Sequence, residues 1–138
     1  MKVREAMHKG AQWCSPETSV REIARLMREH DIGSVPIGEN DRLIGMVTDR
    51  DIVCRGVADA RDLDSLTARQ VMSEGIIYCR ADEDLEDAVH LMEQRQIRRL
   101  PVIDDNKRMV GILALGDVSH AGARNLSGEV LQAVSAHH

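Results

Sequence analysis

The sequence predicts an α/β (α+β) fold built from two tandem copies of one β-α-β-β-α unit. The first observation behind this prediction is an internal repeat within the 138-residue chain. The second is helical periodicity early in each copy, and the third is a pair of strand-like runs that follows, divided by a polar turn. Hydrophobic residues make up 43% of the chain and charged residues 30%, which suits a folded domain with a core. Phe is absent and Trp and Tyr occur once each, so we expect an aliphatic core of Ile, Leu, Val, Met and Ala.

The internal repeat is visible when the sequence is shifted by 65 residues and, after a one-residue insertion, by 66. The first shift pairs Met7 with Met72, Cys14 with Cys79, Met27 with Met92, Ile32 with Ile97 and Pro36 with Pro101. The second pairs Arg42 with Arg108, Gly45 with Gly111 and Asp51 with Asp117. An ordered series of matches with one small gap indicates duplication. We therefore expect domains at residues 1–60 and 68–122, a linker at 61–67 and a tail helix at 123–138.

Each copy is expected to open with a short strand, at residues 11–14 and 76–79, and to continue into an amphipathic helix. The apolar positions of both helices follow the spacing i, i+3, i+4 and i+7, which places them on one face. They are Val20, Ile23, Ala24 and Met27 in copy one, and Leu85, Ala88, Val89 and Met92 in copy two. Ser19 with Glu22 predicts a capping box at the first helix, and Asp84 is expected to cap the second.

Two strands divided by a polar turn are expected after each helix, and a second helix closes each copy. In copy one the strands are predicted at 34–37 and 43–47, with the second helix beginning near Asp49. In copy two they are predicted at 99–103 and 109–113, with the second helix beginning near Gly116. The later strand of each pair is a continuous apolar run, which is typical of a strand buried on both faces.

The net charge and the absence of several motifs exclude a number of function classes. A net charge of −5 argues against DNA binding, which needs a basic surface. No apolar run approaches the ~20 residues of a membrane-spanning helix and no signal peptide is recognisable, so we expect no membrane partner and a cytoplasmic location. The three cysteines form no CxxC pair and the six histidines show no ligand spacing, so no metal site is predicted. No catalytic triad or Walker loop is present, so we expect no enzyme.

The two copies together resemble a tandem pair of CBS domains, also called a Bateman module. In copy one the resemblance is carried by residues 30–37 (HDIGSVPI) and 43–52 (LIGMVTDRDI). In copy two it is carried by residues 97–104 (IRRLPVID) and 109–118 (MVGILALGDV). The resemblance covers nearly the whole chain and implies a stand-alone, bacterial-type CBS protein. It also implies two pseudo-twofold-related units packed as a sandwich, with a ligand cleft between the copies.

The resemblance further implies that an adenosine-containing ligand binds in that cleft, such as AMP, ADP, ATP, NAD or S-adenosylmethionine. Asp51 and Asp117 stand where the family places the carboxylate that holds the ribose hydroxyls. Thr48 and Arg50 suit the phosphates, because hydroxyl and guanidinium groups donate hydrogen bonds to phosphate oxygens. The expected adenine walls lie on the proline-containing strands and at the short strands before the helices. They are Val35, Pro36, Ile37 and Trp13 in copy one, and Leu100, Pro101 and Tyr78 in copy two.

The two copies are chemically unequal at the expected site. Copy two has Ala114 where copy one has Thr48, so it lacks the hydroxyl, and it has Gly116 where copy one has Arg50. Copy two instead carries Arg98 and Arg99. One of these is expected to face the phosphates, because neighbouring residues on a strand point to opposite faces; the alternative is a solvated surface pair. We expect copy one to hold the more complete site.

Three pairs of residues have more than one interpretation. Thr48 and Asp51 also fit a capping box for the following helix, which is compatible with ligand contact. Trp13 and Tyr78 either pack as the only large aromatic residues or contact the adenine ring. Cys14 and Cys79 are expected to be small buried apolar side chains, with a redox pair as the alternative.

The sequence thus predicts a non-catalytic regulatory sensor that binds an adenosine nucleotide, needs no other cofactor and signals by a change of conformation. The expected partners are the nucleotide and a second copy of the chain, because the resemblance implies a homodimer arranged as a disc of four CBS domains. The alternative is a structural or protein-interaction module without a nucleotide response. The loss of side-chain donors at Ala114 and Gly116 leaves that alternative open for one of the two sites.

Overall fold

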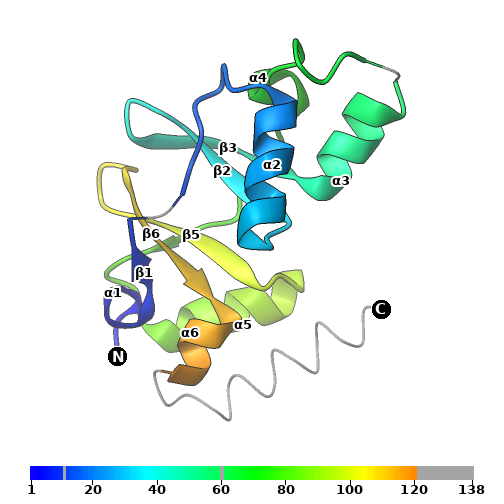
Figure 1. Cartoon of the computed structure of the whole chain (residues 1–138). Helices are drawn as coiled ribbons and strands as arrows, with labels where there is room; N and C mark the ends of the chain where they lie inside the picture. Colours follow the sequence, from blue (N-terminus) through cyan, green and yellow to red (C-terminus); the bar gives the residue numbers. More distant parts are fainter. Residues whose placement is uncertain (11, 60, 121–138) are drawn as a thin grey trace. The chain divides into compact units, whose positions relative to one another are not determined.

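The computed structural model describes residues 1–10, 12–59 and 61–120, which form two compact units. Unit 1 contains residues 1–10 and 77–120, and unit 2 contains residues 12–59 and 61–76. Each unit combines helices with a sheet, so the predicted α/β class is confirmed (Figure 1). The tail helix expected at residues 123–138 lies outside the described residues.

The long helix of each copy forms where the apolar periodicity predicts it. α2 spans Val20–His30 in unit 2 and α5 spans Leu85–Arg95 in unit 1, so the two helices begin and end at equivalent residues. Ser19 caps α2, because its hydroxyl accepts a hydrogen bond from the Glu22 backbone N–H at 3.2 Å. Asp84 lies at the N-cap of α5 but makes no capping bond, and its carboxylate instead accepts a hydrogen bond from Lys2 Nζ at 2.9 Å. The prediction that the Asp84 side chain caps α5 is therefore wrong.

The two strands after each long helix pair antiparallel, as predicted. β2 (Ser34–Glu39) pairs with β3 (Arg42–Thr48) in unit 2, and β5 (Arg99–Ile103) pairs with β6 (Met109–Ala114) in unit 1. In unit 1, β4 (Cys79–Arg80) lies parallel beside β5 and β1 (His8–Lys9) lies antiparallel beside β6, which gives the order β1-β6-β5-β4. In unit 2 the same two places hold single bridging residues, Cys14 opposite Ile37 and Ser73 opposite Met46. The strands predicted at 11–14 and 76–79 are thus reduced to one bridge and a two-residue strand.

The segment that precedes each β-α-β-β-α copy packs into the unit of the other copy. α1 (Val3–Ala6) and β1 precede copy one, yet both belong to unit 1 together with copy two. α4 (Ala68–Val71) and Ser73 precede copy two, yet they belong to unit 2. Equivalent backbone bonds fix both segments, from Val3 N–H to Glu83 O at 2.9 Å and from Ala68 N–H to Thr18 O at 2.8 Å. The sequence repeat and the compact units are therefore divided at different points of the chain.

The second helix of each copy also begins close to its predicted start. In copy one, α3 (Asp49–Asp51) continues into a wider π-helical stretch, η1 (Ile52–Val57). In copy two, α6 spans Leu115–His120. The stretch expected as a polar linker contributes to the core of unit 2, since Leu66 is buried and its carbonyl accepts the Val20 N–H at 2.8 Å. None of the described helices has the length and apolar character needed to cross a membrane.

Each unit has a separate aliphatic core. In unit 1 it consists of Val3, Cys79, Leu85, Ala88, Val89, Met92, Leu100, Val102, Leu113 and Val118. In unit 2 it consists of Cys14, Val20, Ile23, Met27, Val35, Ile37, Val47, Ile52, Leu66, Ala68 and Val71. Among the described residues the predicted aliphatic composition is confirmed, with one buried cysteine added to each core.

Candidate functional site

The predicted ligand residues fall into two equivalent sets, one in each unit. Unit 2 holds Trp13, Val35, Pro36, Ile37, Thr48, Arg50 and Asp51. Unit 1 holds Tyr78, Arg98, Arg99, Leu100, Pro101 and Asp117. Within each set the sheet pairing brings the proline-containing strand next to the junction between a strand and the following helix.

Some of the apolar residues predicted to contact adenine are buried in the core of their own unit. Val35 and Ile37 pack in the core of unit 2, and Leu100 packs in the core of unit 1. Pro36 lies on the other face of β2, because strand residues alternate, and its carbonyl accepts a hydrogen bond from the Cys14 N–H at 3.0 Å. Only backbone groups of Val35, Ile37 and Leu100 are left for a ligand, and their role as adenine walls stays a prediction.

A two-way hydrogen-bonded cap holds the junction between β3 and α3. Thr48 Oγ1 accepts a hydrogen bond from the Asp51 N–H at 3.1 Å. Asp51 Oδ2 accepts one from the Thr48 N–H at 2.9 Å. This arrangement is the capping box that the sequence predicts, with Asp in the usual place of Glu. The Thr48 hydroxyl hydrogen can still donate elsewhere, because the cap uses only an oxygen lone pair.

The other carboxylate oxygen of Asp51 accepts no hydrogen bond from any described residue. Asp51 Oδ1 lies 4.0 Å from Arg55 Nη1, and the Asp51 side chain is 12% exposed. Arg55 instead donates a hydrogen bond from Nη1 to the Val71 carbonyl at 2.8 Å. Arg50, on the same helical turn as Asp51, is exposed and forms no ion pair within the described part of the chain. The junction thus offers an open carboxylate oxygen, a hydroxyl and an uncommitted guanidinium group.

At the equivalent junction of copy two, both carboxylate oxygens of Asp117 have partners. Asp117 Oδ2 accepts a hydrogen bond from the Ala114 N–H at 2.8 Å. Asp117 Oδ1 lies 2.9 Å from His8 Nε2, and the Asp117 side chain is 9% exposed. Ala114 supplies no hydroxyl. This junction therefore lacks both the open oxygen and the side-chain donor that copy one presents.

His8 is a residue of this junction that the sequence analysis missed. It lies on β1 opposite Ile112 of β6, 109 positions before Asp117 in the chain, and no local motif connects the two. The repeat contained a partial signal, because the 65-residue shift aligns His8 with Ser73, the residue opposite Met46 in unit 2. The alignment alone does not tell which unit each of the two residues joins.

Arg98 and Arg99 lie beside the β6–α6 junction in unit 1. Arg99 pairs with Ala114 across the sheet, and the Arg98 carbonyl accepts a hydrogen bond from the Leu115 N–H at 3.0 Å. Arg98 is exposed and Arg99 is half-buried. Neither guanidinium group forms an ion pair with another described residue. Their role as phosphate ligands stays a prediction.

The matching aromatic residues belong to neither core. Trp13 is 37% exposed and Tyr78 is half-buried, and neither packs in a core cluster of the described residues. Their interpretation as core aromatics is therefore not supported, and contact with adenine stays a prediction.

Cys14 and Cys79 are buried thiols, as expected, whereas Cys54 on η1 is exposed. Burial raises the pKa of the Cys14 thiol, and a hydrogen bond with Thr18 partly opposes this. Burial raises the pKa of Cys79 to about 12, and the nearby Glu83 carboxylate adds to the effect. All three cysteines are free.

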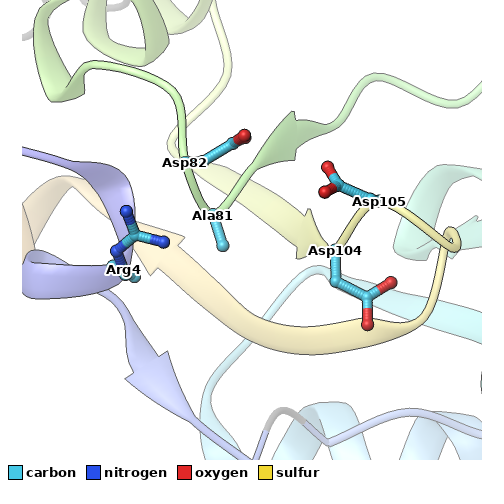
Figure 2. Close-up of a pocket in the computed structure, with 5 residues that line it drawn as sticks. All are labelled: Arg4, Ala81, Asp82, Asp104 and Asp105. Carbon is cyan, nitrogen blue, oxygen red and sulfur yellow. The ribbon is translucent and has the colours of Figure 1, made fainter.

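A separate hollow of about 160 Å³ in unit 1 contains none of the predicted residues. It is lined by Arg4, Ala81, Asp82, Asp104 and Asp105 (Figure 2). Asp104 Oδ1 is already engaged by the backbone N–H groups of Asn106 at 2.8 Å and Arg108 at 3.0 Å. Three carboxylates beside one arginine disfavour a phosphate. Within the described ranges, this hollow included, no three His, Cys, Asp or Glu side chains are grouped to hold a metal ion.

The two α/β units share one topology. Each has an aspartate at the junction between its last strand and the following helix. These features define a duplicated α/β module. The chain belongs to the CBS domain family, which matches residues 3–56 and 68–124. The predicted membership in a tandem CBS pair is therefore confirmed.

Two relatives show that the chain is similar to stand-alone CBS proteins. It is 42% identical over 117 residues to the CBS domain-containing protein YhcV of Bacillus subtilis, covering 85% of this chain and 82% of YhcV. It is 39% identical over 117 residues to Hypoxic response protein 1 of Mycobacterium tuberculosis, covering 84% of this chain and 81% of that protein.

Solved structures of CBS pairs share this fold. The crystal structure of Hypoxic Response Protein I with two coordinated zinc ions aligns with a TM-score of 0.77 at 38% identity, over 87% of this chain and 98% of that one. CBSX2 in complex with AMP aligns with a TM-score of 0.75 at 26% identity, over 89% and 96% of the two chains. The CBS domain pair of protein MJ0100, in complex with 5-methylthioadenosine and S-adenosyl-L-methionine, aligns with a TM-score of 0.74 at 25% identity, over 91% and 98%. Structural relatives of this chain therefore bind adenosine-containing ligands.

Proposed function

We propose that this chain is a non-catalytic regulatory module that binds an adenosine-containing nucleotide, AMP, ADP, ATP or NAD, at the β3–α3 junction of copy one. The nucleotide shifts the protein between two conformations, which requires different affinities for the two. CBSX2 and the MJ0100 CBS pair, both bound to adenosine compounds, support this ligand class. The cytoplasmic location expected from the sequence is part of the same proposal.

The observation that carries the proposal is the open oxygen of Asp51. A carboxylate oxygen has two lone pairs and accepts two hydrogen bonds, which matches the two neighbouring hydroxyls of a ribose. The cap with Thr48 fixes the Asp51 side chain, so little conformational freedom is lost on binding. Asp51 is also largely shielded from solvent, which strengthens hydrogen bonds to its charge.

The groups around Asp51 supply what the rest of the nucleotide needs. The Thr48 hydroxyl and the Arg50 guanidinium group are both hydrogen-bond donors without a committed anionic partner among the described residues. A phosphate ester accepts hydrogen bonds and carries negative charge, so these donors suit it. In copy two, Ala114 and the His8-bound Asp117 offer neither the hydroxyl nor the open oxygen. We therefore assign the nucleotide to copy one.

The two aspartates make a matched pair for testing this assignment. Isothermal titration calorimetry with AMP, ATP, NAD and S-adenosylmethionine is carried out on the wild type, Asp51→Asn and Asp117→Asn. Asparagine retains an oxygen for the backbone N–H of the cap but removes the charge. Loss of a hydrogen bond to a charged group costs about 1.5–3 kcal/mol, so Asp51→Asn should weaken binding by about 10- to 150-fold. Asp117→Asn should leave the affinity within about two-fold of wild type by the same scale.

The opposite ranking of the two variants would move the site to copy two. Equal loss in both would show that the nucleotide depends on both junctions. Absence of heat with every ligand would remove the nucleotide proposal and favour a structural or protein-interaction module. A thermal-shift assay gives an independent readout, because a ligand at 100 times its dissociation constant adds about 2.7 kcal/mol of stability.

A second copy of the chain is the macromolecular partner included in the proposal. η1 carries Val53 and Val57 one turn apart, and both are 56% exposed. Exposed aliphatic side chains on a neighbouring pair of positions suit a protein interface.

A further inference from the structure

His8 and Ser73 occupy the same place in the two units. His8 lies opposite Ile112 of β6, and Ser73 lies opposite Met46 of β3. The 65-residue shift aligns His8 with Ser73, and the 66-residue shift aligns Met46 with Ile112. In each unit the backbone therefore brings one of these two residues beside the strand that leads to the junction aspartate.

The side chains at these two places differ in how far they reach. The His8 ring extends to Asp117, where Nε2 lies 2.9 Å from Oδ1. Because a carboxylate oxygen only accepts hydrogen bonds, Nε2 is the donor in this contact. In unit 2, neither Ser73 nor any other described residue donates a hydrogen bond to Asp51 Oδ1. Arg55 Nη1 lies 4.0 Å from that oxygen, beyond hydrogen-bond distance.

The two carboxylates are otherwise held in the same way. Asp117 Oδ2 accepts the Ala114 N–H at 2.8 Å, and Asp51 Oδ2 accepts the Thr48 N–H at 2.9 Å. In both units Oδ1 is therefore the oxygen left for a ligand. Both hydroxyls of a ribose can bind there only when its two lone pairs are free, and His8 uses one of them. The residue that the opening segment supplies thus decides whether the carboxylate can accept a ribose.

His8 is a removable block and no part of the core. Its side chain is 80% exposed, so moving it away from Asp117 exposes little apolar surface. Beside this junction, Arg98 and Arg99 form no ion pair within the described part of the chain, and Arg99 lies opposite Ala114. Guanidinium groups donate hydrogen bonds to phosphate oxygens. Unit 1 therefore retains donors for a nucleotide phosphate although it lacks the threonine hydroxyl.

We propose that His8 closes a second nucleotide site at Asp117, and that the residue at this place in each unit determines whether the unit binds. Histidine closes the carboxylate, and serine leaves it open. The inference rests on the proposed nucleotide binding at Asp51 and adds a second site for the same ligand class. The ligand is a nucleotide with free 2′ and 3′ hydroxyls, because the carboxylate recognises that pair of groups.

Removal of His8 from a protein with a disabled copy one site tests the second site directly. Isothermal titration calorimetry with AMP and ATP compares Asp51→Asn with the double variant Asp51→Asn, His8→Ser. The double variant should bind at least about ten-fold more tightly, since a competing hydrogen bond to a charged group is removed. Adding Asp117→Asn should abolish this gain. Serine at position 8 reproduces the residue found in unit 2, so the pairing of β1 with β6 is retained.

The reciprocal substitution, Ser73→His, tests the same rule in unit 2. An imidazole opposite Met46 is placed to reach Asp51 as His8 reaches Asp117, and it should weaken nucleotide binding at least about ten-fold. Combining Ser73→His with His8→Ser should restore binding. The restored binding should be lost on Asp117→Asn and retained on Asp51→Asn, the reverse of the ranking expected for the wild type.

Two control variants carry comparable changes one position away. Lys9→Ser removes a cation next to His8, and Glu74→His adds an imidazole next to Ser73; both residues are exposed. Neither control should change the affinity by more than about two-fold, because neighbouring side chains point in different directions. A ligand control is 2′,3′-dideoxy-ATP, which lacks the two hydroxyls and should gain nothing from His8→Ser.

The outcomes separate this inference from the proposed function. If Asp51→Asn, His8→Ser binds no better than Asp51→Asn, or if the gain survives Asp117→Asn, the inference is overturned. Wild-type binding that depends on Asp51 then leaves the proposed function intact. Absence of heat in both the wild type and His8→Ser overturns both. Heat in His8→Ser alone supports the inference and overturns the assignment to copy one. Circular dichroism checks the fold, and the His8→Ser comparison decides the question even if Ser73→His unfolds.

Discussion

Asp51 and Asp117 show how one position in a repeat acquires two electrostatic environments. Both accept a hydrogen bond from the backbone N–H of the residue three positions earlier. They differ in the partner of the second oxygen, which is open in Asp51 and lies 2.9 Å from His8 Nε2 in Asp117. A ribose at Asp117 would have to displace the histidine first, and this displacement reduces the affinity available to a ligand there.

The buried thiol of Cys79 predicts a specific loss of stability at alkaline pH. The pKa of Cys79 is about 12 in the folded protein, whereas an unfolded cysteine has a pKa of about 8.5. Between these values the unfolded chain has lost a proton that the folded chain retains. The free energy of unfolding therefore falls as pH rises, by up to about 1.4 kcal/mol per pH unit for this one group. Urea unfolding at pH 8, 9 and 10 measures the slope.

Cysteine variants isolate this contribution. Cys79→Ala should show a shallower decline with pH than wild type, whatever its absolute stability. Cys54→Ala is the matched control, because it also removes one thiol, but at an exposed position. Identical slopes in all three proteins would show that Cys79 does not titrate differently on unfolding.

At the scale of elements, Gly45 on β3 and Gly111 on β6 each lie against the segment that comes from outside their own copy. A Cβ at Gly111 would lie 2.5 Å from the His8 carbonyl oxygen of β1 and 2.7 Å from Met7 Sδ. A Cβ at Gly45 would lie 2.5 Å from Met72 Sδ. The glycines thus let a segment from outside the copy approach the strand closely.

These contacts predict unequal effects of alanine at the two glycines. Gly111→Ala should destabilise the protein by about 1–3 kcal/mol, because the clash is with backbone and β1 must move. Gly45→Ala should cost less, since the flexible Met72 side chain can move aside. Gly75→Ala is the control, as a Cβ there meets nothing within 4 Å. Chemical denaturation ranks the three, and a larger loss for Gly45→Ala than for Gly111→Ala would contradict this account.

The elements that sequence predicts well are those whose signal is local. α2 and α5 follow from apolar spacing over one helix face, and the Thr48–Asp51 cap follows from a three-residue spacing. The short strands are poorly predicted from local sequence, because Cys14 and β4 pair with residues more than 20 positions away. His8 was missed for the same reason, since its carboxylate partner lies at the other end of the described chain.

At the scale of the whole molecule, the sequence predicts the duplication. It does not predict the exchange of opening segments, in which the segment before each copy packs into the unit of the other copy. Residues 1–10 and 66–75 are aligned by the 65-residue shift and make equivalent backbone bonds. Periodicity therefore cannot distinguish a segment that packs with its own copy from one that packs with the other. Only the fold shows that each unit draws on both halves of the chain.

This exchange predicts how fragments of the chain behave. A fragment of residues 1–60 lacks the segment that completes unit 2, and a fragment of residues 61–138 lacks the segment that completes unit 1. Each alone should give no cooperative thermal transition by circular dichroism, whereas an equimolar mixture should recover one. A fragment of residues 12–76 contains all of unit 2 and should fold by itself. Independent folding of residues 1–60, equal to that of 12–76, would contradict the exchange.

The opening segments, residues 1–10 and 66–75, also give the covalent connection between the two copies a physical role. An isolated copy would leave one side of its sheet without a partner strand, and such an edge readily accepts a strand from another chain. Joining the copies raises the effective concentration of the missing segment to the millimolar range expected for a short linker. The duplicated chain is thus an intramolecular counterpart of a domain-swapped dimer. A fragment that ends at residue 60 instead of residue 76 lacks the segment that covers the sheet of unit 2, and we expect its open edge to promote aggregation.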